Sequence, residues 1–155
     1  MKIRLATAAD APSIVSITNA AFAVETFLDN TRTDAAGVAA MMQKGHFLVA
    51  EQRPAHIVAS VYIELRGVSG YFGMLAVDPS QQRKGLGRLM AKAAEDHCRK
   101  QGCSAMDITV LSLRPELPPY YRELGYVETG TEEFHPLRPL KAGVECHCIR
   151  MTKVL

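Results

Sequence analysis

The stretch that decides the fold is Tyr71–Gly102, YFGMLAVDPSQQRKGLGRLMAKAAEDHCRKQG. We interpret it as a strand, a tight basic turn and a long helix. Gly85 and Gly87 lack a Cβ, so the turn can curl with its N–H groups pointing inward where the helix begins. A helix start offers unpaired N–H donors and a partial positive charge, and the basic residues of Arg83–Arg88 add full charges. The sequence therefore predicts a site for a large, multiply charged phosphate ligand.

The spacing within the turn narrows the choice of phosphate ligand. No third glycine after Gly87 completes a dinucleotide fingerprint, and no G-x-x-x-x-G-K-[ST] sequence indicates an NTP-binding P-loop. What remains is Gln82-x-x-Gly85-x-Gly87, after a strand that ends in Val-Asp-Pro. This pattern resembles the acetyl-CoA-binding motif of the GNAT superfamily of N-acyltransferases. The alternative is an ordinary glycine-rich connection with a solvated basic face.

A second motif lies in Leu117–Tyr126, LPPYYRELGY, where two prolines can open a short helix and Gly125 can close it. It resembles the F-Y-x-x-L-G-F segment of the same family. Tyr120 takes the apolar position, and Tyr121 takes the position whose hydroxyl usually faces the CoA sulfur. The family often has an asparagine that contacts the cofactor seven positions before this tyrosine. Arg114 stands there instead, either to reach a phosphate or pantetheine carbonyl or because the loop differs.

The resemblance covers nearly the whole chain and implies an α/β GNAT acyltransferase fold. That fold has a mixed central sheet of about seven strands with helices on both faces, here in a single domain over residues 1–155. It implies an N-acetyltransferase that moves an acetyl group from acetyl-CoA to a primary amine by direct attack in a ternary complex. The residues implied in binding the acyl carbonyl, the pantetheine arm and the pyrophosphate are Leu75, Ala76, Val77, Arg83, Lys84, Gly85, Leu86, Gly87 and Arg88.

The chemistry requires an acid and a base. Tyr121 is the implied acid, because a phenol with a pKa of about 10 can donate to a departing thiolate whose thiol has a pKa of about 8.5. An alkylamine is mostly protonated near neutral pH, so another group must accept its proton. Glu64 and Glu25 are the candidate carboxylates, and a water chain ending at a backbone carbonyl or carboxylate is the alternative.

A second class of function stays open at this point, a non-catalytic acyl-CoA-binding sensor or regulatory module. Tyr121 favours an enzyme. The acceptor can be a small-molecule amine or a peptide amine. Glu25, Asp29 and Asp34 are acidic residues that could hold a cationic amine, although a solvated face is the more typical place for each.

Hydrophobic periodicity predicts the remaining elements. We expect a strand at 3–5, helices at 10–22 and 33–45, strands at 46–51, 56–65 and 71–77, a helix at 86–102, a strand at 105–111 and a short helix at 117–125. A strand after 125, a proline-rich connection at 134–139 and a terminal strand at 144–151 complete the chain. Gly73 predicts a bulge or a close approach in its strand. The long helix should face the sheet with Leu86, Leu89, Met90, Ala93, Ala94 and His97.

Composition excludes several functions. The chain has 155 residues, 48% hydrophobic and 22% charged, with a net charge of +2, which is too weak to predict nucleic-acid binding. No stretch approaches the length of a membrane span, so we expect a cytoplasmic protein without a membrane partner. The four cysteines have no C-x-x-C spacing, which predicts reduced thiols and no metal site. A homodimer through the terminal strand is possible.

Overall fold

The computed structural model describes residues 1–28, 31–135 and 139–155, so the predictions for Asp29 and for 136–138 lie outside the described residues. The predicted order of elements is confirmed. The helices and strands are β1 (Lys2–Leu5), α1 (Ala11–Ala21), α2 (Ala35–Lys44), β2 (His46–Arg53), β3 (His56–Arg66), β4 (Ser69–Val77), α3 (Leu86–Lys100), β5 (Ala105–Leu111), α4 (Leu117–Glu123), β6 (Val127–Glu133) and β7 (His147–Val154).

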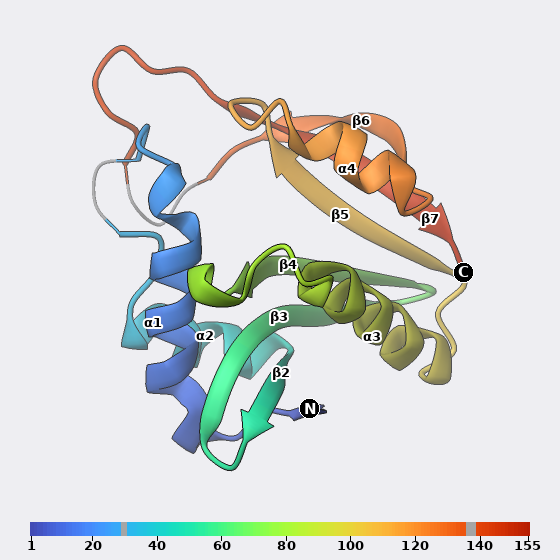
Figure 1. Cartoon of the computed structure of the whole chain (residues 1–155). Coiled ribbons are helices and arrows are strands. Elements are labelled where there is room, and N and C mark those ends of the chain that lie inside the picture. The colour runs from blue at the N-terminus through green and yellow to red at the C-terminus, as the bar shows by residue number, and fades with distance from the viewer. Residues whose placement is uncertain (29–30, 136–138) are drawn as a thin grey trace.

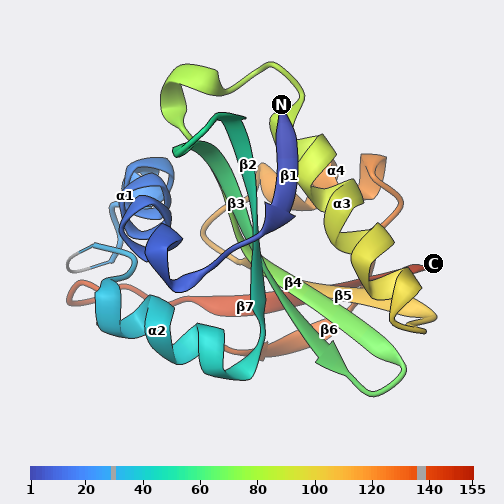
Figure 2. The same cartoon turned by 90° about the horizontal axis from the view of Figure 1, so that it is seen from below.

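These strands form a seven-stranded sheet in the order β1-β2-β3-β4-β5-β7-β6. Within the described ranges, β4 and β5 pair in parallel, as a crossover through α3 allows, and the other neighbours are antiparallel. Figures 1 and 2 show α1 and α2 on one side of the sheet and α3 on the other. The predicted mixed sheet with helices on both faces is confirmed.

The centre of the sheet opens where β4 leaves β5. Residues Ser69–Tyr71 of β4 pair with Ala105–Asp107 of β5, and beyond these residues the two strands diverge (Figure 1). The register between β3 and β4 also shifts after Gly73, and Met74 takes a φ of 52°. The predicted irregularity at Gly73 is therefore a bulge. Together the bulge and the divergence leave part of the β4 backbone without a strand partner on its β5 side.

The buried face of α3 differs from the predicted one. Leu89 is 43% exposed, whereas Ala91, Glu95 and Cys98 are buried with Leu86 and Met90. The reason is Glu95, whose carboxylate accepts hydrogen bonds from the Tyr126 hydroxyl (2.8 Å) and from Lys153 Nζ (2.9 Å). With both partners in place the Glu95 carboxylate can occupy the core, so the face of α3 that carries Glu95 is the buried one.

The terminal strand also differs from its prediction, since it runs from His147 to Val154 and leaves Cys146 outside. It lies between β5 and β6, so the exposed edges of the sheet are β1 and β6. A second copy of the chain could therefore add a strand only at those edges. None of the helices in the described ranges is long and apolar enough to cross a membrane.

Candidate active site

The basic turn opens α3 without a side-chain cap. Gly85 precedes the helix with a φ of 80°, and no side chain bonds the first N–H groups. Arg83 is a second left-handed residue, with a φ of 66°, which the sequence did not predict. Gly87 serves a different purpose, because a Cβ there would lie 3.1 Å from the Tyr120 hydroxyl oxygen. The turn thus presents free helix N–H donors beside open space.

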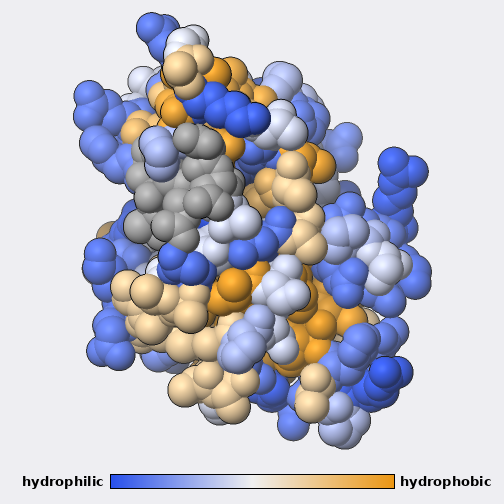
Figure 3. All heavy atoms as spheres, turned by 90° about the vertical axis from the view of Figure 1, so that its left-hand side faces the viewer, coloured by the Kyte–Doolittle hydropathy of each residue, from blue (hydrophilic) through white to orange (hydrophobic). Residues whose placement is uncertain are grey.

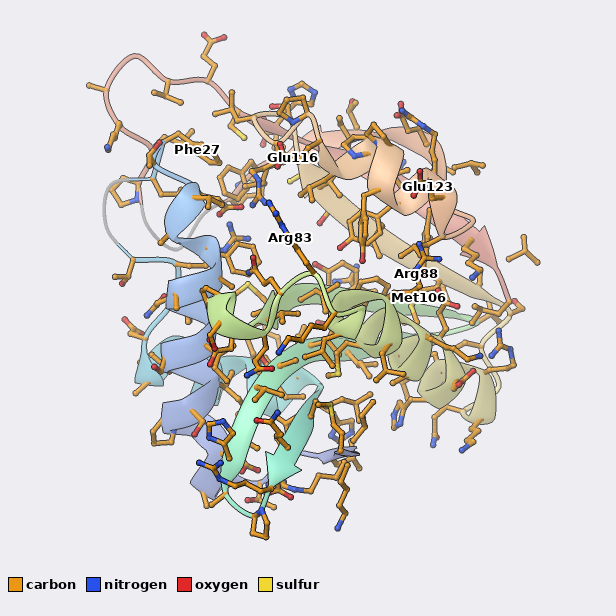
Figure 4. The ribbon with its side chains drawn as sticks, in the orientation of Figure 1. Phe27, Arg83, Arg88, Met106, Glu116 and Glu123 are labelled. Carbon is orange, nitrogen blue, oxygen red and sulfur yellow. The ribbon has the colours of Figure 1, made fainter. Side chains whose placement is uncertain are left out.

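Two arginines of this turn have no counter-ion in the part of the chain that the structure describes. No carboxylate among the described residues pairs with Arg83 or Arg88, while Lys84 Nζ is hydrogen-bonded to Gln81 Oε1 at 3.2 Å. Figure 4 shows Arg83 extending from the turn toward the segment that carries Glu116. Unpaired guanidiniums of this kind suit bidentate contacts with phosphate.

A cavity of about 530 Å³ lies between this turn and α4. Of the residues predicted to bind the cofactor, all except Ala76 and Lys84 line it. Ala76 is buried and packs toward α1. Leu75, Val77 and Leu117 give the cavity an apolar stretch beside its cationic end. Phe22 also contributes, and no local sequence signal had indicated that the end of α1 reaches this site.

Tyr121 lies where this cavity meets a second one. It lines both, and its ring packs between Phe72, Tyr120 and Tyr126, with ring centroids 5.1–6.1 Å away. Its side chain has no hydrogen-bond partner among the residues that the structure describes. Burial raises the pKa of Tyr121 well above its ordinary value, so the hydroxyl keeps its proton near neutral pH. Near neutral pH it is thus a neutral hydroxyl that can donate a hydrogen bond or a proton, and it is not present as a phenolate.

The second cavity has a volume of about 290 Å³ and lies between the diverging strands β4 and β5. Tyr71 and Met74 line it from β4, Thr109 from β5 and Cys148 from β7, with Phe22 and His135 from connecting segments. The strands β4 and β5 diverge toward the side of the molecule that faces the viewer in Figure 3, where the surface carries both hydrophobic and hydrophilic residues. A small molecule placed here would contact Tyr121 in a cavity that no residue of the basic turn lines.

Charged side chains meet at the end of this second cavity. Glu25 is 5% exposed, and its Oε2 accepts a hydrogen bond from Arg114 Nη1 at 2.8 Å. Its Oε1 accepts from Arg32 Nη1, and Arg114 Nε donates to Glu116. The prediction that Glu25 lies on a solvated face is wrong, because it is buried and paired with two arginines, one of them 89 positions away along the chain. Arg114 does line both cavities, but it is held by two carboxylates rather than left free for a phosphate.

Two other predicted acidic residues take different places. Asp34 caps α2, where its Oδ1 accepts from the Gly37 N–H at 2.7 Å. Glu64 does not line either cavity. Its carboxylate accepts from the Tyr62 hydroxyl (2.7 Å) and from Arg66 Nε (2.9 Å). Burial opposes ionisation of Glu64, but these two hydrogen bonds outweigh it and lower its pKa. The guanidinium of Arg66 stacks on Tyr71, which does line the second cavity.

Sequence comparison matches residues 15–136 to the family described as "Acetyltransferase (GNAT) domain". No curated protein matches the sequence. A ribosomal-protein-alanine N-acetyltransferase from Brucella melitensis is a similar solved structure, with 22% identity over 100% of both chains and a TM-score of 0.77. A Salmonella typhimurium protein solved with its cofactor acetyl-CoA has 23% identity and a TM-score of 0.73 over 100% of this chain and 94% of that one.

A mutant of spermidine N-acetyltransferase from Vibrio cholerae is also similar, with 16% identity and a TM-score of 0.75 over 99% of this chain and 95% of that one. At these identities the solved structures show the shared fold alone. The residues present nevertheless fit acetyl-CoA as a ligand. Nothing lies within 4 Å of a Cβ built on Gly85, and the two unpaired arginines stand beside that open space.

Proposed function

Because the chain belongs to the GNAT acetyltransferase family, as its two sequence motifs predicted, we propose that it moves an acetyl group from acetyl-CoA to a primary amine by direct attack in a ternary complex. The observation that carries this proposal is the position of Tyr121, a protonated tyrosine that lines both the larger cavity beside the basic turn and the smaller cavity between β4 and β5. One cavity suits a phosphate-bearing donor and the other suits an acceptor. A proton donor stands between them.

Each requirement of the reaction has a group in this chain. The turn of Arg83–Arg88 would hold the pyrophosphate, and a backbone N–H of Leu75–Val77 would donate to the acetyl carbonyl oxygen. Acetyl-CoA, when bound, supplies the acetyl thioester. As the new C–N bond forms and the C–S bond breaks, Tyr121 donates its proton to the departing sulfur. Holding both reactants side by side provides much of the acceleration.

The proton of the attacking amine must leave the acceptor cavity. We propose Glu64 as its destination, acting through water or through Tyr71, because Glu64 itself does not line the cavity. Glu25 is less suited, since its side chain is 2% exposed and two arginines hold its oxygens, whereas the Glu64 side chain is 23% exposed and one of its two donors is the neutral Tyr62 hydroxyl. We expect the reaction in the cytoplasm, where the free cysteines stay reduced. A homodimer remains a proposal.

The direct test is release of CoA from acetyl-CoA with a panel of amines: amino acids, polyamines, aminoglycosides and lysine-containing peptides. We expect turnover of one class, with the acetylated amine identified by mass spectrometry and the protein's own thiols subtracted. Binding of acetyl-CoA without turnover of any amine would contradict the proposed catalysis and favour a sensor. Absence of binding would contradict the assignment of the basic turn.

Arg88→Gln is expected to raise the Kd for acetyl-CoA about tenfold, because a charge-assisted hydrogen bond to phosphate is lost. Isothermal titration with acetyl-CoA measures this, and the loss should shrink as salt rises. Lys92→Gln is the matched control: it removes a positive charge from the same helix, but the Lys92 side chain is 71% exposed and pairs with Asp96 rather than lining the cavity. Equal losses in the two variants would assign the effect to net charge rather than to a phosphate contact.

A further inference from the structure

We propose that Arg32 binds a carboxylate of the acceptor, so that the amine this chain acetylates is a small molecule carrying an acidic group, as an α-amino acid does. The inference rests on the proposed acetyltransferase function and adds the class of its acceptor. It is carried by the contacts of Arg32, by the charges around the second cavity and by the size of that cavity.

Arg32 is a fixed guanidinium at a cavity wall. Its Nη1 donates to Glu25 Oε1, and its planar group lies over the Phe22 ring at 4.8 Å from the centroid. The side chain is 20% exposed, and it lines both the second cavity and a neighbouring one at the end of α1. Two contacts therefore orient the group without using all of its donors. A guanidinium has five N–H donors, and its fork matches a carboxylate.

Among the described residues that line the second cavity, guanidiniums outnumber carboxylates. Arg32 and Arg114 both line it, and the carboxylate that they share, Glu25, is the only one among the described residues that line it. Glu116 pairs with Arg114 from the side of the first cavity, and its side chain is 59% exposed. Buried cations require partners. Arg32 thus shares its carboxylate partner with Arg114 and keeps N–H donors for an acceptor carboxylate, whereas the one carboxylate that the described residues contribute to this cavity is already paired and could not serve a polyamine.

The dimensions favour a small molecule. The cavity holds about 290 Å³, near the lower end for pockets that enclose metabolites. Tyr121 lines the same cavity as Arg32. One small molecule could therefore place its carboxylate on Arg32 and its amine toward Tyr121. Arg114 is a positioning residue in this scheme, because it holds Glu25, which in turn holds Arg32.

A purely structural role for Arg32 makes a different prediction. If the arginine only completed an ion pair with Glu25, its loss would reduce the turnover of every acceptor by the same factor. If it binds the acceptor carboxylate, its loss reduces the turnover of acids and leaves that of the matching amides. The ratio of kcat/KM for the acid to kcat/KM for the matching amide therefore distinguishes these two roles.

The experiment compares matched acceptors at saturating acetyl-CoA: amino acids, the corresponding amino acid amides, and spermidine. We expect wild type to prefer acids over amides by about tenfold or more in kcat/KM, the contribution of a charge-assisted contact. Arg32→Gln should reduce this ratio to near one, mainly through the KM of the acid, with the KM for acetyl-CoA unchanged. Arg32→Lys should restore part of it. Arg99→Gln, which removes an exposed arginine from the end of α3, should leave the ratio as in wild type.

Each outcome decides the inference. Equal turnover of acids and amides, preference for spermidine, or a ratio that Arg32→Gln leaves unchanged would overturn it while the acetyltransferase assignment stands. Absence of turnover with every amine would overturn the proposed function and this inference together. A loss of turnover in Arg32→Gln that is the same for acids and amides would assign the arginine to the structure alone.

Discussion

Tyr121→Phe is expected to lower kcat about 100-fold while the KM for acetyl-CoA stays unchanged. The hydroxyl lines both cavities and is the proposed proton donor to the departing sulfur. The loss belongs at the low end of the range for general acid catalysis, because a thiolate is a good leaving group. Steady-state measurement of CoA release with the best acceptor checks this decrease in kcat. A decrease in kcat of less than about threefold would mean that proximity of the reactants suffices.

Tyr126→Phe is the matched control for this variant. Both tyrosines belong to one aromatic cluster, but the Tyr126 hydroxyl donates to Glu95 and lines neither cavity. Its removal should lower the free energy of unfolding and leave kcat unchanged. Tyr121→Phe should lower kcat and leave the free energy of unfolding unchanged, since the Tyr121 hydroxyl has no partner among the described residues and the ring contacts remain. Equal effects on kcat would indicate damage to the cluster rather than a lost proton donor.

The conformation of the basic turn could be predicted from sequence because its determinants are local. The left-handed Gly85 and the uncapped start of α3 lie within a few residues of each other. The order of strands and helices likewise followed from periodicity and from the two motifs. The buried face of α3 did not, since periodicity gives a wide stripe whose edge depends on neighbours. Here the neighbours of Glu95 lie 31 and 58 positions away along the chain.

The surroundings of the second cavity were harder to predict for the same reason. Glu25 and Arg114 are 89 positions apart, and nothing in either segment indicates the other. The alternation of β3 places Glu64 on the same face as Tyr62, but it does not say whether that face meets a cavity. A carboxylate's surroundings decide whether it is a base, a partner or a solvated group. Sequence supplies the carboxylate, and the fold supplies the surroundings.

Glu25→Gln is expected to lower the free energy of unfolding by about 3 kcal/mol, because it leaves two guanidiniums without their shared counter-ion. The Glu25 side chain is 2% exposed, and those of Arg32 and Arg114 are 20% and 18% exposed. Urea unfolding followed by circular dichroism measures the change, with the slope of the transition as a check that the unfolded states are comparable. A loss below about 1 kcal/mol would mean that water already screens the network.

The control variant is Glu128→Gln, which breaks the ion pair with Arg122. Those side chains are 48% and 52% exposed, so the loss should stay below about 1 kcal/mol. The triple variant Glu25→Leu, Arg32→Met and Arg114→Met tests what the network is for. Because apolar replacements of buried ion groups are often neutral or stabilising, it should recover the stability that Glu25→Gln loses. It should not recover turnover of acidic amines, since a cavity wall without Arg32 cannot bind their carboxylate. Stability regained without activity would assign these buried charges to recognition of the acceptor rather than to folding.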